Sequence, residues 1–338
     1  MANFASDNTA PVHPKVMQAL LDANSGNMPA YGNDPVTEKL QETVRMTFAA
    51  PQARTFPVFN GSACNGLALA RMIRPYESIL AHRQSHINND ECGLPEFFTG
   101  SKIVGLEGDH AKLTVASIGD LIETALGHAP HTSRPKVISL TQSTELGTVY
   151  SLQELQALSA FARTHGLYIH MDGARLANAV ASLDCAPADV VAGVDILSFG
   201  GTKNGAMLAE AAIIFNPALA EDFAYIHKRA GQLPSKARYV SAQLQALLEN
   251  DLWLDLGRHA NAMAKALRDG LIDRPGVGLL HPVEANELFV SLPKATADRL
   301  FAKGHHFYNW PNEGPDAYRL VTSFATTEDD VNTFLNDC

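Results

Sequence analysis

The sequence predicts an α/β protein with a large domain, built on a mostly parallel sheet of seven strands between helices, and a small C-terminal α/β domain. Three observations lead to this prediction. Between about residues 56 and 215, seven apolar or β-rich runs alternate with helical patterns, which favours a parallel sheet with helices on both faces. Residues 216 to about 270 are mostly helical, and short strand and helix patterns resume after residue 276. The 338 residues, 46% of them hydrophobic, suffice for more than one core.

We therefore predict an N-terminal arm over residues 1–14, a large domain over residues 15–248 and a small domain over residues 249–338. The arm is irregular and polar, so Ser6 and Asp7 are typical of a surface segment. No repeat or low-complexity tract interrupts the chain.

Two amphipathic helices are expected before the sheet. Pro14 lies in the first turn of one, and Asp34 and Pro35 are typical of the cap and first position of the other. Apolar residues recur on one face of each helix. They are Val16, Met17, Leu20 and Leu21 in the first, and Val36, Leu40, Val44 and Phe48 in the second.

The predicted strands are short, and polar or glycine-rich segments follow several of them. In the large domain they cover residues 56–59, 77–81, 103–106, 136–140, 167–171, 195–199 and 211–215. In the small domain we expect strands at 278–280, 287–290 and 318–321, helices at 295–303 and 327–335, and His305 and His306 in a solvated turn.

Composition argues against several classes of partner. The net charge is -10 and no basic stripe occurs, so nucleic acid is not an expected partner. No apolar run approaches the roughly 18 residues that a membrane span needs. The N-terminus lacks the features of a signal peptide, and the four cysteines form no CxxC pair. We therefore expect a cytoplasmic protein with reduced thiols.

The segment from Asp195 to Gly205 joins an apolar strand to two glycines, a threonine, Lys203 and another glycine. A lysine at the inner end of a strand is costly unless its amine is used. The small neighbours allow a bulky group to approach the backbone. We interpret Lys203 as a Schiff-base lysine for pyridoxal 5'-phosphate (PLP); a solvated loop lysine is the alternative.

Asp172 follows the apolar strand 167–171 and opens the string Asp172-Gly-Ala-Arg175. A carboxylate at the end of a buried strand costs desolvation free energy unless it meets a cation. The functional interpretation is a partner for the pyridine nitrogen of PLP. The alternative is a helix N-cap aspartate beside an exposed Arg175.

A glycine turn follows the strand at 56–59, and a helix follows the turn. Its residues Gly61, Ser62 and Ala63 can form an anion cup, because free backbone N–H groups and the positive helix end favour a phosphate. An ordinary helix N-cap is the alternative. The pattern is not GxGxxG, so a dinucleotide site is not expected.

His86 belongs to a polar segment after the strand at 77–81. Its H-x3-H spacing with His82 fits no standard metal pattern, so we expect no metal site. A histidine that contacts a ligand at the carboxyl edge of the sheet is the better interpretation. Lys203, Asp172, the cup and His86 together supply the amine, carboxylate, anion site and stacking face that PLP requires.

The chain resembles the low-specificity L-threonine aldolases, PLP enzymes of fold type I in the aspartate aminotransferase superfamily. The resemblance covers essentially the whole length. It is carried by Ser6-Asp7, Tyr31-Gly-Asn-Asp-Pro35, Asn60-Gly-Ser62, His86, His170-Met-Asp172-Gly-Ala-Arg175 and the lysine segment. Two departures from the family pattern are Thr202, where serine is commoner, and Thr141–Gly147, which replaces a glutamate-asparagine-threonine-histidine string.

The resemblance implies a role for each matching residue. Lys203 and Asp172 act on the cofactor ring, and His86 stacks on it and is a candidate base. The remaining residues fall into three groups. Gly61, Ser62, Ala63 and Arg238, the last from a neighbouring subunit, bind phosphate; Ser6, Arg175 and Arg319 grip the substrate carboxylate, with Arg175 also at the cofactor; His131 lies near the substrate β-hydroxyl and Tyr31 near the site. Either His86 or His131 is the base that removes the β-hydroxyl proton.

The implied activity is that of an aldehyde-lyase. It cleaves the Cα–Cβ bond of L-threonine, L-allo-threonine and related β-hydroxy-α-amino acids to glycine and an aldehyde. The implied assembly is a homotetramer, a dimer of dimers with shared sites. The alternatives are an aldolase that prefers phenylserine, a β-eliminating lyase, a non-catalytic PLP-binding protein, and a protein without PLP.

Overall fold

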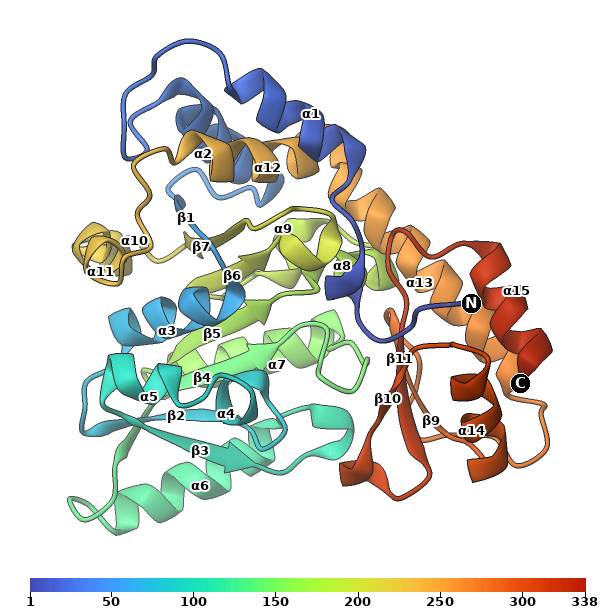
Figure 1. Ribbon diagram of the computed structural model, residues 1–338. Coiled ribbons are helices and arrows are strands. Elements are labelled where there is room, and N and C mark those ends of the chain that lie inside the picture. The colour runs from blue at the N-terminus through green and yellow to red at the C-terminus, as the bar shows by residue number, and fades with distance from the viewer.

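A seven-stranded sheet forms the centre of the computed structural model, which describes residues 1–338 (Figure 1). Its strand order is β1-β7-β6-β5-β4-β2-β3. Strands β2 to β6 run parallel, and β7 is antiparallel to both β6 and β1. The strands are β1 Arg54–Val58, β2 Glu77–His82, β3 Lys102–Leu106, β4 Arg134–Thr141, β5 Tyr168–Gly173, β6 Ile196–Gly200 and β7 Glu210–Ile214. The predicted mostly parallel sheet is confirmed.

Helices cover both faces of this sheet, as predicted, because alternate strand residues point to opposite sides. On β2, Leu80 joins one apolar core while Ile79 and Ala81 join the other. Helices α2, α6, α7, α8 and α12 cover the first core, and α3, α10 and α11 cover the second. The helices are α1 Pro14–Ala23, α2 Pro35–Thr47, α3 Gly61–Met72, α4 His86–Asn89, α5 Leu94–Thr99, α6 Val115–Gly127, α7 Leu152–Thr164, α8 Leu176–Leu183, α9 Pro187–Val190, α10 Pro217–Ala220, α11 Phe223–Arg229 and α12 Arg238–Leu248.

The apolar stripe expected on α1 is only partly buried. Val16 is fully buried, but Met17 is 40% exposed and Leu21 is 63% exposed. One apolar edge of this helix therefore faces solvent in the single chain.

A second, antiparallel sheet of order β10-β11-β9-β8 carries the C-terminal part of the chain. Its strands are β8 Gly278–Leu279, β9 Glu287–Ser291, β10 Tyr308–Asn309 and β11 Ala317–Val321. The helices of this part of the chain are α14 Lys294–Ala302 and α15 Glu328–Asp337. The two-residue strand β10 is too short to be visible in a sequence pattern. Helix α13, Leu252–Leu271, packs Trp253 into the large core and Leu267 into the small one. The domain boundaries given above stay a prediction.

The N-terminal arm packs on the small domain instead of lying free on the surface. Phe4 is fully buried, its N–H donates to the His306 carbonyl at 2.7 Å, and its carbonyl accepts from the Val321 N–H at 2.8 Å. The solvated turn expected at His305 is wrong, because its ring is buried between the Ala2 N–H and the Asp337 carboxylate. This docking carries Ser6 and Asp7 toward the large sheet.

The topology gathers the segments that follow β2, β4, β5 and β6 at one edge of the sheet, because the carboxyl ends of parallel strands lie together. The small domain lies beside this edge (Figure 1). No helix in the structure combines the length and apolar character needed to cross a membrane.

Candidate active site

A cavity of about 380 Å³ lies at the carboxyl edge of the large sheet. Its lining includes Lys203, Asp172, His86, Gly61, Ser62 and Arg175, which are six of the predicted site residues. They come from the ends of three strands, β2, β5 and β6, and from the start of α3. The parallel topology therefore brings the predicted amine, carboxylate, anion cup and imidazole together.

The loop after β6 presents Lys203 to this cavity. Its Nζ donates no hydrogen bond and forms no ion pair within the chain. Gly200 lets the loop approach β5 closely, because a Cβ there would lie 2.6 Å from the Ala174 carbonyl oxygen. The buried Glu210 carboxylate accepts the N–H groups of Gly201 and Thr202, both at 3.2 Å. Burial raises the pKa of Glu210 to about 7.

Asp172 is the next-to-last residue of β5 and is 6% exposed. Its Oδ1 accepts the Ala174 N–H at 3.0 Å, and its Oδ2 accepts the Asn65 side-chain N–H at 2.9 Å. Two positions earlier on the strand, His170 bonds the hydroxyls of Ser139 and Ser198. Burial lowers the pKa of His170 to about 4, so this imidazole stays neutral and adds no charge beside Asp172.

The start of α3 offers two free donors to the cavity. The N–H groups of Gly61 and Ser62 make no hydrogen bond within the chain, and open space surrounds Gly61. The expected contribution of Ala63 is corrected, because its N–H donates to the Asn60 side-chain oxygen at 2.8 Å and is not free. Asn60 thus caps the helix and leaves the first two N–H groups for an anion.

His86 stands across the cavity as the first residue of α4. Its Nδ1 lies 2.9 Å from Glu91 Oε1, and this hydrogen bond raises the pKa of His86 despite its partial burial. Asn65 on α3 donates to both Glu91 and Asp172, at 2.9 Å each. The Asn65 side-chain amide therefore connects the His86–Glu91 pair to Asp172.

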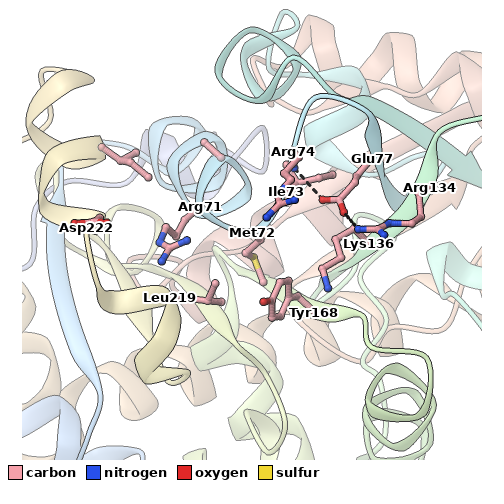
Figure 2. A pocket seen from close by; sticks show the side chains of 12 residues that line it. Arg71, Met72, Ile73, Arg74, Glu77, Arg134, Lys136, Tyr168, Leu219 and Asp222 are labelled. Atoms are coloured by element: carbon pink, nitrogen blue, oxygen red, sulfur yellow. Dashed lines mark hydrogen bonds and ion pairs between the residues drawn. The ribbon is translucent and has the colours of Figure 1, made fainter.

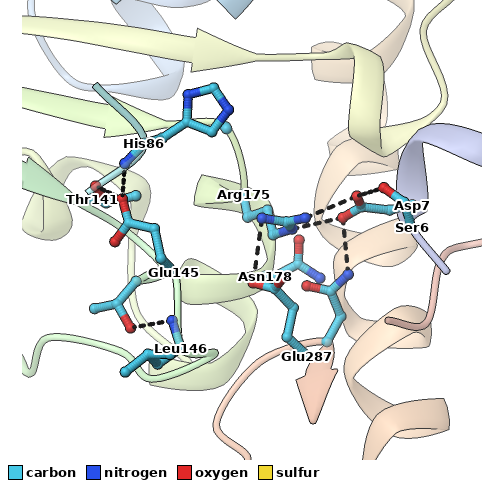
Figure 3. A network of polar contacts seen from close by, with 12 residues as sticks. Ser6, Asp7, His86, Thr141, Glu145, Leu146, Arg175, Asn178 and Glu287 are labelled. Atoms are coloured by element: carbon cyan, nitrogen blue, oxygen red, sulfur yellow. Dashed lines mark hydrogen bonds and ion pairs between the residues drawn. The ribbon is translucent and has the colours of Figure 1, made fainter. Parts of the chain in front are cut away.

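Arg175 is held by two carboxylates from distant parts of the chain, as Figure 3 shows. Its Nε and Nη2 donate to the two oxygens of Asp7, at 2.7 and 3.0 Å, and its Nη1 lies 3.3 Å from Glu287 Oε2. Only 12% of the Arg175 side chain is exposed. Asp7 also accepts the Asn286 side-chain N–H at 3.1 Å. Arg175 is therefore a buried, oriented cation at the cavity wall. The alternative interpretation, in which it is exposed, is wrong.

Arg319 and Ser6 lie beside this ion-pair network and do not line the cavity. The Arg319 guanidinium stacks 4.6 Å from the centre of the Trp310 ring and lies 4.0 Å from Glu287. Ser6 caps a short 3-10 turn over Asp7–Thr9, where its Oγ accepts the Asn8 N–H.

The chain matches the family model described as "Beta-eliminating lyase" over residues 3–295. It is 43% identical to the low specificity L-threonine aldolase of Pseudomonas aeruginosa, over 99% of this chain and 96% of that protein. The chain belongs to the beta-eliminating lyase family. The solved structure of Leishmania major threonine aldolase is similar to it with a TM-score of 0.94, 31% identity and coverage of 99% of this chain and 98% of that one.

The fold of this family member extends to more distant proteins. An aspartate aminotransferase of Thermus thermophilus matches with a TM-score of 0.73 and 17% identity, over 100% of this chain and 90% of that chain. At that identity the likeness shows the shared fold alone. The expected relationship to the aspartate aminotransferase fold is confirmed.

Three further predicted residues of this family member, His131, Arg238 and Tyr31, do not line the cavity of their own chain. His131 lies between α6 and β4, at the amino-terminal edge of the sheet, because the loop precedes its strand instead of following it. Arg238, at the start of α12, donates to the Gly26 carbonyl, and Tyr31 is 49% exposed under Lys228. A role for these side chains in catalysis requires the site of a neighbouring chain.

Sequence reasoning missed several acidic and amide groups that line or support the cavity. The local sequence indicates a surface position for Asp7, because its buried partner Arg175 is 168 residues away in the sequence. No sequence pattern marks Asn65, Glu91 or Glu210 as residues of the site. The polar segment 141–147 does contain Glu145, and its place after β4 was the available signal.

A second cavity, of about 460 Å³, opens at the opposite edge of the sheet and contains several cations (Figure 2). These cations already have partners within the chain. Arg134 pairs with Glu77, Arg71 donates to the Ala218 and Glu221 carbonyls, and Lys136 donates to the Gly166 carbonyl. None of the predicted site residues lines this cavity.

Proposed function

We propose that the protein is a PLP-dependent aldolase that cleaves L-threonine, L-allo-threonine and related β-hydroxy-α-amino acids to glycine and an aldehyde. The observation that carries the proposal is the single cavity lined by Lys203, Asp172 and the free N–H groups of Gly61 and Ser62. The aldolase names of its relatives support the same reaction.

The cavity fits PLP in the chemistry of its walls. Lys203 offers an unpartnered amine for the cofactor aldehyde, and Gly61 and Ser62 offer unpartnered donors for its phosphate. Asp172 offers a carboxylate, oriented by Asn65, for the ring nitrogen. His86 offers an imidazole face. When bound, PLP supplies an electron sink for the pair of electrons that the Cα–Cβ bond releases.

The residues around Arg175 orient the substrate at the other end of the cavity. Each Nη of Arg175 carries a second N–H that neither Asp7 nor Glu287 takes up, and these two N–H groups can receive the substrate carboxylate. Arg319 and Ser6 lie close enough to this network to contribute in the same region. Fixing the carboxylate there fixes the direction of the Cα–Cβ bond, which decides which bond is weakened.

A homotetramer with shared sites is part of the proposal. Apolar side chains that face solvent in one chain include Met17 and Leu21 on α1, and Met207 and Leu208 beside the Lys203 loop. Such surfaces are typical of subunit contacts. In that assembly Arg238, Tyr31 and His131 would act on a neighbouring chain. A cytoplasmic location is consistent with four unpaired cysteines.

A β-eliminating lyase is the second candidate, because the matching family model carries that description. Incubation of the purified, PLP-loaded protein with L-threonine separates the two reactions. The aldolase releases glycine and acetaldehyde in equal amounts, whereas elimination releases a 2-oxo acid and ammonia. Comparison with phenylserine tests the aryl-preferring alternative. Formation of oxo acid and ammonia without glycine would refute the proposed aldolase.

A further inference from the structure

Glu145 is a carboxylic acid of the cavity wall to which the proposed function assigns no task. It lies on the segment between β4 and α7. Its Oε1 accepts the Thr141 hydroxyl at 2.7 Å and the backbone N–H of His86 at 2.9 Å. Figure 3 shows Glu145 grouped with His86 and Thr141, opposite Arg175 and Asp7. The carboxyl group therefore adjoins the stacking histidine on the wall that faces the substrate-binding arginine.

The second oxygen of Glu145 has no hydrogen-bond partner within the chain, although it is shielded from bulk water. A buried polar atom without a partner is unusual in folded proteins and costs free energy. Because Glu145 lines the cavity, a molecule bound there can supply the missing partner. A substrate hydroxyl is a group of the right kind, since it can both donate and accept.

The segment that carries Glu145 is held firmly. The Gln142 side chain bonds both the N–H and the carbonyl of Tyr150, at 3.0 Å each. Gly147 has a φ of +74° and packs against β9, where a Cβ would lie 2.6 Å from the Glu287 carbonyl oxygen. This packing fixes the position of the Glu145 carboxyl group relative to His86. Glu145 can therefore act only on a group that is bound next to it in the cavity.

The charge state of Glu145 suits a group that both accepts and returns a proton. Burial raises its pKa to about 7, against the opposing effect of the Thr141 and His86 hydrogen bonds. Asp172 on β5 adds to this rise of the pKa. The other ionisable groups that line the cavity are His86 and Glu91 after β2, Arg175 after β5, Lys203 after β6 and Glu210 on β7. An acid–base catalyst works best when its pKa lies near the working pH.

The other titratable groups of the cavity have different partners. His86 is the only histidine that lines it, and its Nδ1 is already bound to Glu91, a hydrogen bond that raises the His86 pKa. Glu91 is bound to His86 and shares Asn65 with Asp172, at the ring-nitrogen end of the site. Both oxygens of Glu210 accept N–H groups of the lysine loop.

We propose that Glu145 is the catalytic residue that takes the proton from the substrate β-hydroxyl. The O–H bond breaks, the proton passes to the carboxylate, and the β-oxygen forms the aldehyde C=O as the Cα–Cβ bond breaks. The bond's electron pair remains on the Cα side, where bound PLP would delocalise it. Cα then takes up one proton from solvent, in balance with the proton that Glu145 later returns to solvent, and glycine is released. Glu145 loses its proton before the next cycle, so atoms and charge balance without another reactant. This inference rests on the proposed aldolase function.

Glu145→Gln is the sharpest test, because the glutamine oxygen can still accept the Thr141 and His86 hydrogen bonds. In the PLP-loaded enzyme we expect kcat for threonine cleavage to fall at least about 100-fold, the usual scale of acid–base catalysis. Exchange of the glycine α-proton in D2O, which involves no β-hydroxyl, should stay within about 3-fold of wild type. Cleavage within about 5-fold of wild type would overturn the proposal. Equal loss of cleavage and exchange would also overturn it, since Glu145 would then act only by positioning.

The pH dependence gives a second kinetic signature. Glu145 must be ionised to accept the proton, and its raised pKa keeps it neutral below about pH 7. In the wild type, kcat/KM should therefore fall as the pH falls through this range, and Glu145→Gln should lose that limb. Retention of the same limb in the variant would assign it to another group.

Titration of the carboxyl groups themselves does not depend on turnover. Infrared spectra of protein labelled with ¹³C-glutamate should show carboxyl protonation near pH 7 that is reduced in Glu145→Gln. Glu210→Gln is the matched control, because burial raises the Glu210 pKa to a similar value and the Glu145 band should survive its replacement. Absence of any difference between wild type and Glu145→Gln would overturn the proposal. A wild type that titrates as expected but forms no glycine would refute the aldolase function instead.

Discussion

The buried pair of Asp7 and Arg175 allows a stability prediction with a definite magnitude. Replacing Asp7 with Asn removes one carboxylate from a guanidinium that is only 12% exposed. Removing one partner of a buried ion pair typically costs about 3–5 kcal/mol. Glu287 remains 3.3 Å from the same guanidinium and keeps part of its charge compensated. We therefore expect the low end of this range, about 3 kcal/mol.

This cost converts into a change of melting temperature through the unfolding entropy. At about 2.1 cal/mol/K per residue, a chain of this length has an unfolding entropy of roughly 0.7 kcal/mol/K. A loss of about 3 kcal/mol then lowers Tm by about 4 °C. Differential scanning calorimetry of Asp7→Asn measures this shift. Asp22→Asn on the exposed face of α1 is the matched control and should leave Tm unchanged within about 1 °C.

The same variant has a signature in acid. Burial alone would raise the Asp7 pKa, but the charges of Arg175 and Lys203 and the hydrogen bonds from Arg175 and Asn286 hold it below its ordinary value. A depressed carboxyl pKa stabilises the fold above the unfolded pKa, near 4, and that stability is lost as the pH falls further. Asp7→Asn should lack this part of the acid dependence. A Tm within about 1 °C of wild type at pH 7 would refute the role of the pair.

Three further predictions concern the cavity. Asp172→Asn should retain the bound cofactor's absorbance but lower kcat, because the ring nitrogen loses its carboxylate; an unchanged kcat in steady-state assays would contradict the assignment. Arg319→Ala should raise KM for threonine by roughly 10-fold or more, the scale of a lost charge-assisted hydrogen bond, and an equal KM would clear Arg319 of carboxylate binding. Glu91→Gln should lower the His86 pKa in an NMR titration, since the Glu91 hydrogen bond raises it. That bond stabilises the fold at low pH, and its contribution disappears as the pH rises through the raised His86 pKa; a titration identical to wild type would argue against the bond.

The large sheet and its cavity were predictable because each functional group follows a strand with a clear apolar pattern. Lys203 follows β6, Asp172 is the next-to-last residue of β5 and His86 follows β2. Parallel topology then requires these ends to lie at one edge. The chemistry of each side chain supplied the rest, since a lysine or an aspartate at such a position is costly without a partner.

The remaining features depend on contacts between distant segments, which local patterns do not encode. The arm looked like polar surface, yet Phe4 completes the small-domain core and Asp7 binds Arg175. The local sequence predicts a turn at His305, whereas its burial follows from contacts with Ala2 and Asp337 at opposite ends of the chain. His131 was assigned to the site by resemblance, whereas its loop precedes β4.

The central claim is that Lys203 holds PLP through its amine. Absorbance spectra of the PLP-loaded protein, recorded before and after borohydride, test it most directly when the reduced protein is digested and mapped by mass spectrometry. We predict that reduction removes the long-wavelength band and leaves the pyridoxyl group on the peptide that contains Lys203. Attachment to any other lysine, or no attachment at all, would contradict the account.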